Sequence, residues 1–237
     1  MTERLEILLP VHNEAASIES TIEEMHRVIS PLVPASFIVC EDGSSDGTAE
    51  VLRNMARRIP MHLISGPERK GYSRAVLDGM RALRADWLLC LDSDGQCDPA
   101  DFAGFWPVRD PRTLVIGYRV ERADHWARKA MSGSFKLAYR WLLGVSLRDP
   151  SCPYLLVHRE AVRELLPHLG LMQQGFWWEF AARARQAGFR FHEIPVNHRL
   201  RSAGVTQVYR ARKIPGIAWR HIAALFSIRS NPLTPAS

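Results

Sequence analysis

The sequence lacks any long hydrophobic run. A membrane-spanning helix needs about 20 consecutive apolar residues, whereas the longest run near the end of the chain, residues 222–228, is about a third of that length. The amino terminus lacks the pattern of a signal peptide, because Glu3, Arg4 and Glu6 interrupt it before an apolar region develops. We therefore expect a cytoplasmic protein with no signal peptide or transmembrane helix, attached at most peripherally to the cytoplasmic face of a membrane.

Cysteine is scarce and has no metal-binding spacing. The sequence contains no C-x-x-C pair, and two of its four cysteines lie in apolar, strand-like runs; the four are Cys40, Cys90, Cys97 and Cys152. This pattern predicts reduced packing residues rather than disulfides or zinc ligands.

Positive charge is concentrated in the carboxyl half. The formal net charge is +6, and residues 119–148 and 192–229 are crowded with Arg, Lys and His. Such a bias predicts an anionic partner, but charge alone does not choose between nucleic acid, an anionic membrane and a phosphorylated substrate. The sequence has no helix-turn-helix, zinc or RNP pattern, and its aromatic residues recur at core-like spacing, so we expect no nucleic-acid partner.

Strand-like and helix-like segments alternate along the chain. In the first half, the apolar patterns predict strands at 5–9, 37–40, 62–65 and 87–91 and helices at 15–29, 48–58 and 75–83. This alternation predicts βαβ units and a mostly parallel sheet. Further along, we expect strands at 113–118, 154–157 and 190–194, helices at 125–143, 160–166 and 176–186, and an amphipathic tail at 214–228.

Three polar loops each follow a predicted strand: PVHNE at 10–14, CEDGSSDGT at 40–48 and LDSDGQ at 91–96. In a parallel sheet the carboxyl ends of the strands lie along one edge, so the three loops should meet at one crevice. Open α/β sheets bind their ligands there.

Asp92 and Asp94 form the strongest candidate for a metal site. Two carboxylates this close repel one another in a partly desolvated site unless a cation neutralises them. Mg²⁺ and Mn²⁺ suit such hard oxygen ligands, and Gln96 could add a side-chain carbonyl. A solvated turn gives the same D-x-D spacing, and it is the two neighbouring loops that favour a metal bridged to a diphosphate.

The acids of the other loops have two interpretations each. Asp42 could accept hydrogen bonds from a nucleoside, or it could belong to a helix-capping loop together with Asp46. Asn13 and Glu14 could be the N-cap and first-turn acid of the next helix, and Glu14 is also a candidate ribose partner.

The segments PVHNE, EDGSSDGT, KGYSRAVLDGM, LDSDGQCDP, VIGYR and RLRSAGVTQ, in this order, resemble the family 2 glycosyltransferases. Within that family the chain is most similar to dolichyl- or polyprenyl-phosphate mannose or glucose synthases, over roughly residues 3–210. The resemblance implies an α/β fold of GT-A type, a mostly parallel Rossmann-like sheet flanked by helices, spanning residues 1–210. A basic amphipathic tail would occupy residues 211–237.

The implied activity is transfer of mannose or glucose, with inversion, from a GDP- or UDP-sugar donor to a polyprenyl or dolichyl phosphate. The implied metal ligands for Mg²⁺ or Mn²⁺ are Asp92, Asp94 and Gln96. The implied nucleotide-binding residues are Pro10, Asn13, Glu14, Asp42, Lys70 and Asp92. The implied acceptor- or phosphate-binding residues are Arg119, Arg128, Ser132, Arg201, Arg210 and Lys213, and those assigned to catalysis are Asp94, Arg119 and Arg128.

One position departs from the family pattern. Gln207 stands where the family usually has a cation, which weakens the expected phosphate clamp unless Arg210, Arg212 or Lys213 substitutes. A phosphate acceptor is already anionic and needs no general base, whereas a hydroxyl acceptor would need one. Glu179 and Asp149 are the candidates for that base, and each is also explained by a structural role.

Two alternatives therefore stay open: a family 2 enzyme acting on a saccharide or other hydroxyl acceptor, and a non-catalytic nucleotide-sugar or nucleic-acid binding module. The tail is also ambiguous, because its apolar face at 214–226 suits an anionic membrane interface or packing against the domain. The sequence gives no indication of the oligomeric state.

Overall fold

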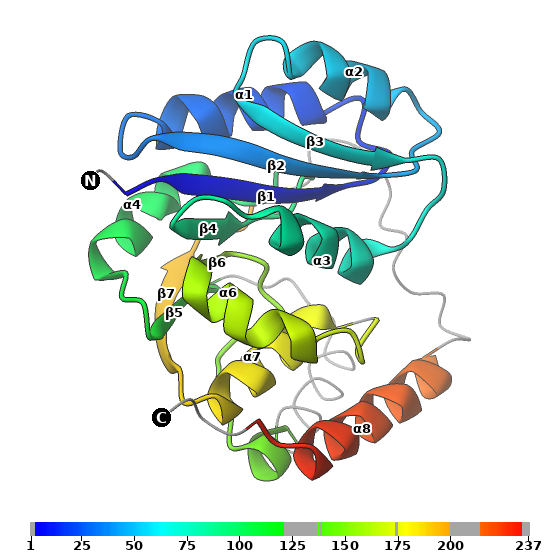
Figure 1. The fold of residues 1–237 in the computed structure, drawn as a ribbon, viewed down its shortest axis with the longest axis vertical. Coiled ribbons are helices and arrows are strands. Elements are labelled where there is room, and N and C mark those ends of the chain that lie inside the picture. The colour runs from blue at the N-terminus through cyan, green and yellow to red at the C-terminus, as the bar shows by residue number, and fades with distance from the viewer. Residues whose placement is uncertain (1–2, 121–136, 138, 174, 200–213, 234–237) are drawn as a thin grey trace.

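The computed structural model describes residues 3–120, 137, 139–173, 175–199 and 214–233, with the backbone alone for 214–220 and 222. Within these ranges the chain forms one seven-stranded sheet in the order β3-β2-β1-β4-β6-β5-β7 (Figure 1). The strands are β1 (Leu5–Val11), β2 (Ala35–Asp42), β3 (Met61–Gly66), β4 (Trp87–Cys90), β5 (Thr113–Arg119), β6 (Leu155–His158) and β7 (Arg190–Val196).

The sheet is mostly parallel, as predicted. Strands β1 to β4 run parallel to one another, and so do β5 and β7. Strand β6 is antiparallel to both of its neighbours, β4 and β5. Its amino end therefore lies at the edge where the other strands have their carboxyl ends.

The helices are α1 (Ile18–Ile29), α2 (Thr48–Met55), α3 (Tyr72–Ala82), α4 (Phe102–Phe105), α6 (Arg159–Leu165), α7 (Phe176–Gln186) and α8 (Ile214–Ser230). Short 3₁₀ turns occur at Pro99–Asp101, Trp106–Val108 and Leu166–His168. The helical turns between 99 and 108 were not predicted, because they are too short to show a helical period. Of the helix predicted at 125–143, only residues 137 and 139–143 are described, and they are helical.

The central strands of the sheet are buried on both faces, and their alternate residues point to opposite sides. Ile7 and Leu9 pack in one cluster with α1 and α4, while Leu8 packs in the other cluster with α3, α6 and α7. In Figure 1 this gives a layer of helices on each side of the sheet. The four cysteines are buried and free, which confirms their predicted packing role.

Helix α3 approaches β1 closely at Gly79. A Cβ added there would stand 2.1 Å from Leu8 Cδ1 and 3.0 Å from Cys40 Sγ. Gly79→Ala is therefore expected to lower the free energy of unfolding by about 1–3 kcal/mol, through overpacking of this layer. Urea unfolding measures the change, and Gly104→Ala is the control, because its added Cβ would stand 3.6 Å from Ile194 Cγ2. A Gly79→Ala variant as stable as the parent would contradict the close packing.

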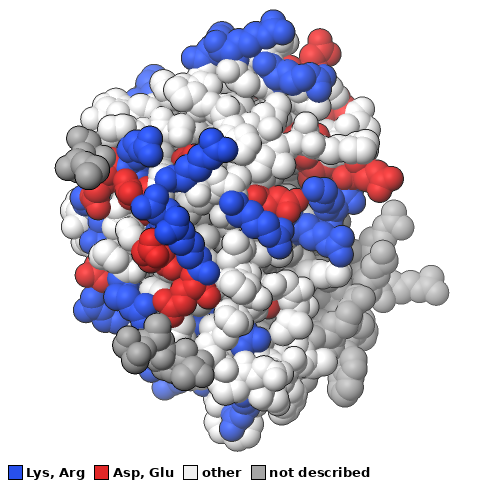
Figure 2. Space-filling model, viewed as in Figure 1, with Lys and Arg blue, Asp and Glu red and all other residues white. Residues whose placement is uncertain are grey.

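Helix α8 packs against the domain through its second half. Leu225 and Ile228 are fully buried in the same cluster as α3, α6 and α7. This favours packing for that part of the predicted tail, while the division of the chain at residue 210 stays a prediction. Among the described residues no helix combines the length and apolarity that crossing a bilayer requires. On the face drawn in Figure 2, acidic and basic side chains are mixed over the upper and middle parts, and the atoms of the lower end that are not grey are white and blue.

Candidate active site

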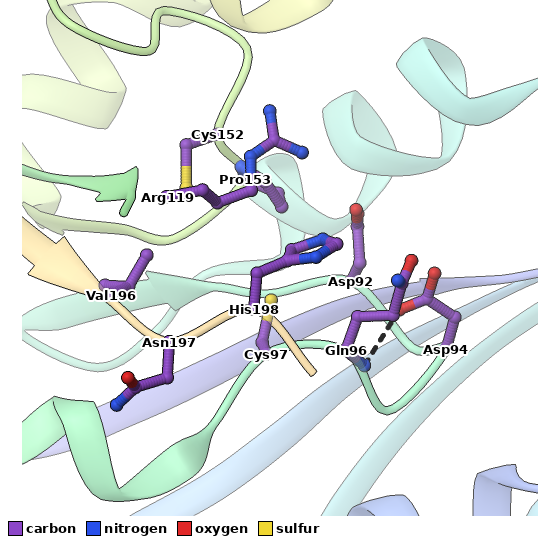
Figure 3. Close-up of a pocket in the computed structure, with 10 residues that line it drawn as sticks. All are labelled: Asp92, Asp94, Gln96, Cys97, Arg119, Cys152, Pro153, Val196, Asn197 and His198. Carbon is purple, nitrogen blue, oxygen red and sulfur yellow. Dashed lines mark hydrogen bonds between the residues drawn. The ribbon is translucent and has the colours of Figure 1, made fainter. Parts of the chain in front are cut away.

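A pocket lies at the edge of the sheet where β4, β5 and β7 have their carboxyl ends. Asp92, Asp94 and Gln96 follow β4, and Arg119 is the last residue of β5. The antiparallel direction of β6 brings the residues just before it to the same edge. The pocket is lined by Asp92, Asp94, Gln96, Cys97, Arg119, Cys152, Pro153, Val196, Asn197 and His198 (Figure 3).

The acidic loop after β4 is fixed by hydrogen bonds at several points. Ser93 Oγ donates to the carbonyl oxygen of Pro10 at the end of β1, 2.9 Å away. The backbone N–H of Gln96 donates to Asp94 Oδ1 at 3.1 Å, closing a turn in which Gly95 has φ 74°. Gln96 Nε2 donates to the carbonyl oxygen of Arg199 at 3.2 Å, which orients this side chain. The loop thus presents its carboxylates from a constrained backbone.

Tyr72 holds Asp92 from the first turn of α3. Its hydroxyl donates to Asp92 Oδ1 at 2.9 Å and accepts a hydrogen bond from Trp177 Nε1 of α7, also at 2.9 Å. Although Tyr72 as a whole is 39% exposed, desolvation of its hydroxyl, together with the negative charge of Asp92, raises the pKa of Tyr72 well above its ordinary value. Tyr72 is therefore a protonated donor at neutral pH. Tyr72 and Trp177 were missed in the sequence, because their only signal was the position of KGYSRA after a strand.

Arg119 is oriented by an ion pair with Asp149. Its Nε donates to Asp149 Oδ2 at 2.6 Å and its Nη2 to Asp149 Oδ1 at 3.0 Å, with Ser151 Oγ at 2.9 Å from Nη2. Burial disfavours the charged form, but the hydrogen bonds to Asp149 outweigh it and raise the pKa of Arg119. The guanidinium thus stays charged at the pocket wall, and Asp149, only 5% exposed, is its anchor.

Glu179, the other candidate for a general base, has a structural role. It is fully buried in α7, and its carboxylate accepts hydrogen bonds from the backbone N–H groups of Gly170, Leu171 and Met172, at 3.1, 3.0 and 2.8 Å. Glu179 does not line the pocket. Its function is to hold the loop that precedes α7.

Asp42 lies at the end of β2 and binds the backbone that leads into α3. Its carboxylate accepts hydrogen bonds from the N–H groups of Lys70 at 2.6 Å and Gly71 at 2.9 Å. The side chain of Lys70 turns away to Asp78, with Nζ 2.9 Å from Oδ2. The structure thus brings these two nucleotide-binding candidates together, while their contact with a nucleotide stays a prediction.

The loops after β1 and β2 are joined by the side chain and backbone of Asn13. Its N–H donates to Ser44 Oγ at 3.0 Å, and its Oδ1 accepts from the N–H of Ser45 at 2.9 Å. Helix α1 begins after Ser17, so the interpretation of Asn13 as its N-cap is wrong. Glu14 is buried and accepts a hydrogen bond from Ser17 Oγ at 3.1 Å. The predicted meeting of the two loops at one edge is confirmed.

Several residues predicted for the site either do not line this pocket or lie outside the described residues. Asp92 is the one member of the nucleotide-binding set that lines the pocket. The structure describes none of the residues Arg128, Ser132, Arg201, Gln207, Arg210 and Lys213, whose assigned roles stay predictions. His198 and Asn197, which follow β7, were missed, although NHRL has the same position after a strand as the three loops that were found. The ring of His198 points toward Asp92 in Figure 3.

The oxygen donors of the pocket fit a hard divalent cation. Asp92 and Asp94 supply carboxylates and Gln96 an amide oxygen, and Mg²⁺ typically takes one or two carboxylates and completes its shell with water and phosphate oxygens. Burial raises the pKa of Cys97 and Cys152, the latter to about 12, so these thiols are poor ligands for a soft metal. Over the described ranges, no cluster of three or more His, Cys, Asp or Glu side chains is placed to hold a metal.

Curated relatives match much of the chain. It is 25% identical to a dolichyl-phosphate beta-glucosyltransferase from Trichomonas vaginalis, with coverage of 97% of this chain and 75% of that protein. It is 26% identical to a polyprenol monophosphomannose synthase from Mycolicibacterium smegmatis, with 87% and 82% covered. An undecaprenyl-phosphate 4-deoxy-4-formamido-L-arabinose transferase from Yersinia enterocolitica is 28% identical over 69% of this chain, which spans about half, 51%, of that relative.

The fold is also that of solved glycosyltransferases. Glucosyl-3-phosphoglycerate synthase from Mycobacterium tuberculosis superposes with a TM-score of 0.68 at 20% identity, over 98% of this chain and 82% of that one. The model of the family described as "Glycosyl transferase family 2" matches residues 6–166, a span that contains the acidic loop, Tyr72, Arg119 and Asp149. The chain therefore belongs to glycosyl transferase family 2.

Proposed function

We propose that the chain is an inverting hexosyltransferase that moves mannose or glucose from a GDP- or UDP-sugar to a polyprenyl or dolichyl phosphate. The observation that carries this proposal is the pocket in which Asp92 and Asp94 share one cavity with Arg119. Two carboxylates suit a metal and its diphosphate, and a guanidinium suits an anionic acceptor. The names of the relatives, which are transferases of sugars to lipid phosphates, support the same acceptor class.

Asp92, Asp94 and Gln96 would hold Mg²⁺ or Mn²⁺, which would supply charge neutralisation to the leaving diphosphate. Tyr72 keeps the Asp92 carboxylate in place, and the turn closed by Gln96 N–H keeps Asp94 in place. Asp42 and Lys70, with Pro10 near the end of β1 and Asn13 and Glu14 on the loop after it, are proposed to bind the nucleotide. These loops are tied together by the hydrogen bonds between Asn13 and Ser44 and Ser45.

The state of the two candidate bases favours a phosphate acceptor. Asp149 is engaged by Arg119 and Ser151, and Glu179 by three backbone N–H groups. A hydroxyl acceptor would need a free base, whereas a phosphate monoester is already anionic and has only to be aligned. Arg119 is suited to that task because Asp149 and Ser151 fix its orientation through Nε and Nη2, while its positive charge attracts a phosphate. Arg128, Ser132, Arg201, Arg210 and Lys213 are proposed to complete the acceptor site. With a lipid acceptor, the chain would act peripherally at the cytoplasmic face of a membrane.

The hydrogen bond from the Tyr72 hydroxyl to Asp92 gives a prediction that can be tested without measuring enzymatic activity. Tyr72→Phe removes the donor to Asp92 Oδ1, so we expect the affinity for Mn²⁺ to fall by about tenfold. Electron paramagnetic resonance of free Mn²⁺ measures this directly during a titration. Tyr118→Phe is the control, because the ring of Tyr118, on β5, stacks with Arg148 and does not line the pocket. Equal Mn²⁺ affinity in parent and Tyr72→Phe would show that this hydrogen bond does not position a metal ligand.

The donor can be identified by thermal stabilisation. A ligand that binds the native state raises the unfolding temperature by mass action, so GDP-mannose, UDP-glucose and the free nucleotides should be compared with and without Mn²⁺. We expect one nucleotide sugar to stabilise the protein, and to do so more strongly with Mn²⁺. If no nucleotide sugar shifts the unfolding temperature, the proposed donor site is wrong.

A further inference from the structure

The acidic residues are absent from two long stretches of the sequence. Residues 125–148 contain five Lys and Arg side chains, and residues 194–237 contain seven, but neither stretch has an Asp or Glu. The rest of the chain carries 19 Lys and Arg against 25 Asp and Glu. The net charge of +6 is therefore unevenly distributed along the chain: these two stretches are basic and the remainder is acidic.

The structure brings the described parts of both stretches side by side. Arg229 Nη1 of α8 donates to the carbonyl oxygen of Leu142 at 3.2 Å, and its guanidinium lies 5.7 Å from the centre of the Trp141 ring. In Figure 1 the helical residues before Leu143 lie beside the carboxyl end of α8 at the lower end of the molecule. In Figure 2 the atoms of that end that are not grey are white and blue.

Large apolar side chains are exposed where the two stretches meet. Trp141 is 77% exposed, Leu137 69% and Phe226 53%. Leu137 and Trp141 are four residues apart and share a helix face. Tyr139 points inward instead, is 1% exposed and donates from its hydroxyl to the carbonyl oxygen of Trp178 at 2.7 Å. The outward face of this helix therefore carries the residues that a water-facing surface normally lacks.

We propose that Leu137, Trp141 and Phe226, flanked by Arg140 and Arg229, dock the protein on an anionic bilayer; we call these five residues the docking ridge. Tryptophan prefers the boundary between headgroups and acyl chains, and nearby arginines are attracted to anionic lipid. A second copy of this chain is a poorer occupant, because two ridges face to face would oppose Arg140 and Arg229 to their own copies. The inference rests on the proposed function, since a lipid acceptor gives the docking its purpose.

The docking ridge is fixed relative to the active site through α7. Tyr139 bonds to Trp178, and the adjacent Trp177 bonds to Tyr72, which holds Asp92. Three hydrogen bonds thus connect the helix that carries Trp141 to the proposed metal site. A surface that presents a lipid-borne phosphate to the pocket requires such a rigid connection.

Flotation with lipid vesicles tests the ridge without any need for turnover. The full chain should bind vesicles of 30% phosphatidylglycerol in phosphatidylcholine, and binding should weaken in high salt and on pure phosphatidylcholine. We expect the double variant Trp141→Ser/Phe226→Ser to lower the partition coefficient by about tenfold or more. Leu32→Ser, which removes an apolar side chain that is 49% exposed in the α1–β2 loop, is the matched control and should bind as the parent does.

Two further measurements separate the docking from the chemistry. The double variant should transfer sugar to a short, water-soluble polyprenyl phosphate at the parental rate, and lose rate only with the acceptor embedded in vesicles. If the parent protein were inactive on both acceptors but still bound vesicles in a way that depends on the docking ridge, the proposed function would be overturned and the docking proposal would stand. Parental flotation of the double variant would overturn the docking ridge. The docking ridge would also be overturned if light scattering showed a dimeric parent and a monomeric double variant while flotation was unchanged. The ridge would then join two copies of the chain.

Discussion

Asp94→Asn is expected to reduce metal-dependent sugar transfer by about two to three orders of magnitude or more. The substitution removes one of the two carboxylates of the pocket, and with it a negative charge that would hold the cation, which in turn would neutralise the leaving diphosphate. The fold should be unaffected, because the asparagine Oδ1 can accept the same hydrogen bond from Gln96 N–H that Asp94 Oδ1 accepts. The loss is therefore expected in transfer rate and in Mn²⁺ binding, with an unchanged unfolding temperature in the absence of metal.

Glu160→Gln is the matched control for Asp94→Asn. It also removes one negative charge, but from a side chain that is 61% exposed and pairs with Arg163 on the surface of α6. Rates measured across a Mn²⁺ titration should be parental for Glu160→Gln. An Asp94→Asn variant with parental rate and parental Mn²⁺ dependence would refute the assignment of the acidic loop.

Arg119→Lys is expected to lower kcat/KM for the acceptor by about 10- to 100-fold, while KM for the donor changes little. Lysine keeps the positive charge but cannot reproduce the fork that binds Asp149 through Nε and Nη2 and also reaches Ser151. The expected loss is therefore one of orientation rather than of charge. Steady-state kinetics with each substrate varied in turn separates the two constants.

Arg58→Lys is the control for this substitution, because Arg58 is exposed and pairs with Glu19 and Glu23 far from the pocket. Asp149→Asn distinguishes an anchor from a base. If Asp149 anchors Arg119, the loss of activity caused by Asp149→Asn should not add to the loss caused by Arg119→Lys, since both changes break the same ion pair. An increase confined to the donor KM in Arg119→Lys would place this arginine at the donor instead.

The sheet and the position of the crevice were predictable because both depend on local patterns. The run 87–91 is apolar, has the length of a strand and ends in acids, and the structure has a buried strand at Trp87–Cys90 followed by the acidic loop. The loops after β1 and β2 meet because parallel strands place their carboxyl ends together, as the bonds between Asn13 and Ser44 and Ser45 confirm.

The side chains that hold the site residues in place could not be predicted, because their hydrogen bonds connect distant parts of the chain. Tyr72 and Trp177 are 105 residues apart, and Glu179 holds a loop through backbone groups that carry no sequence signal. An apolar strand also has no readable direction, so the antiparallel β6, which brings Cys152 and Pro153 to the pocket, was not foreseen. The sequence indicates for Asp149 either a base or a structural role, and its pairing with Arg119 becomes visible only in the assembled sheet.

The most direct test of the proposed function compares two acceptors that differ in one group. The purified chain would be given its stabilising nucleotide sugar and Mn²⁺, with either a polyprenyl phosphate or the polyprenol of the same chain length. We predict that sugar is transferred to the phosphate at a rate at least about 100-fold above that to the alcohol, because Asp149 and Glu179, the two candidate bases, are already engaged by Arg119 and by backbone N–H groups. Transfer to the alcohol or to a saccharide, with none to the phosphate, would contradict the account.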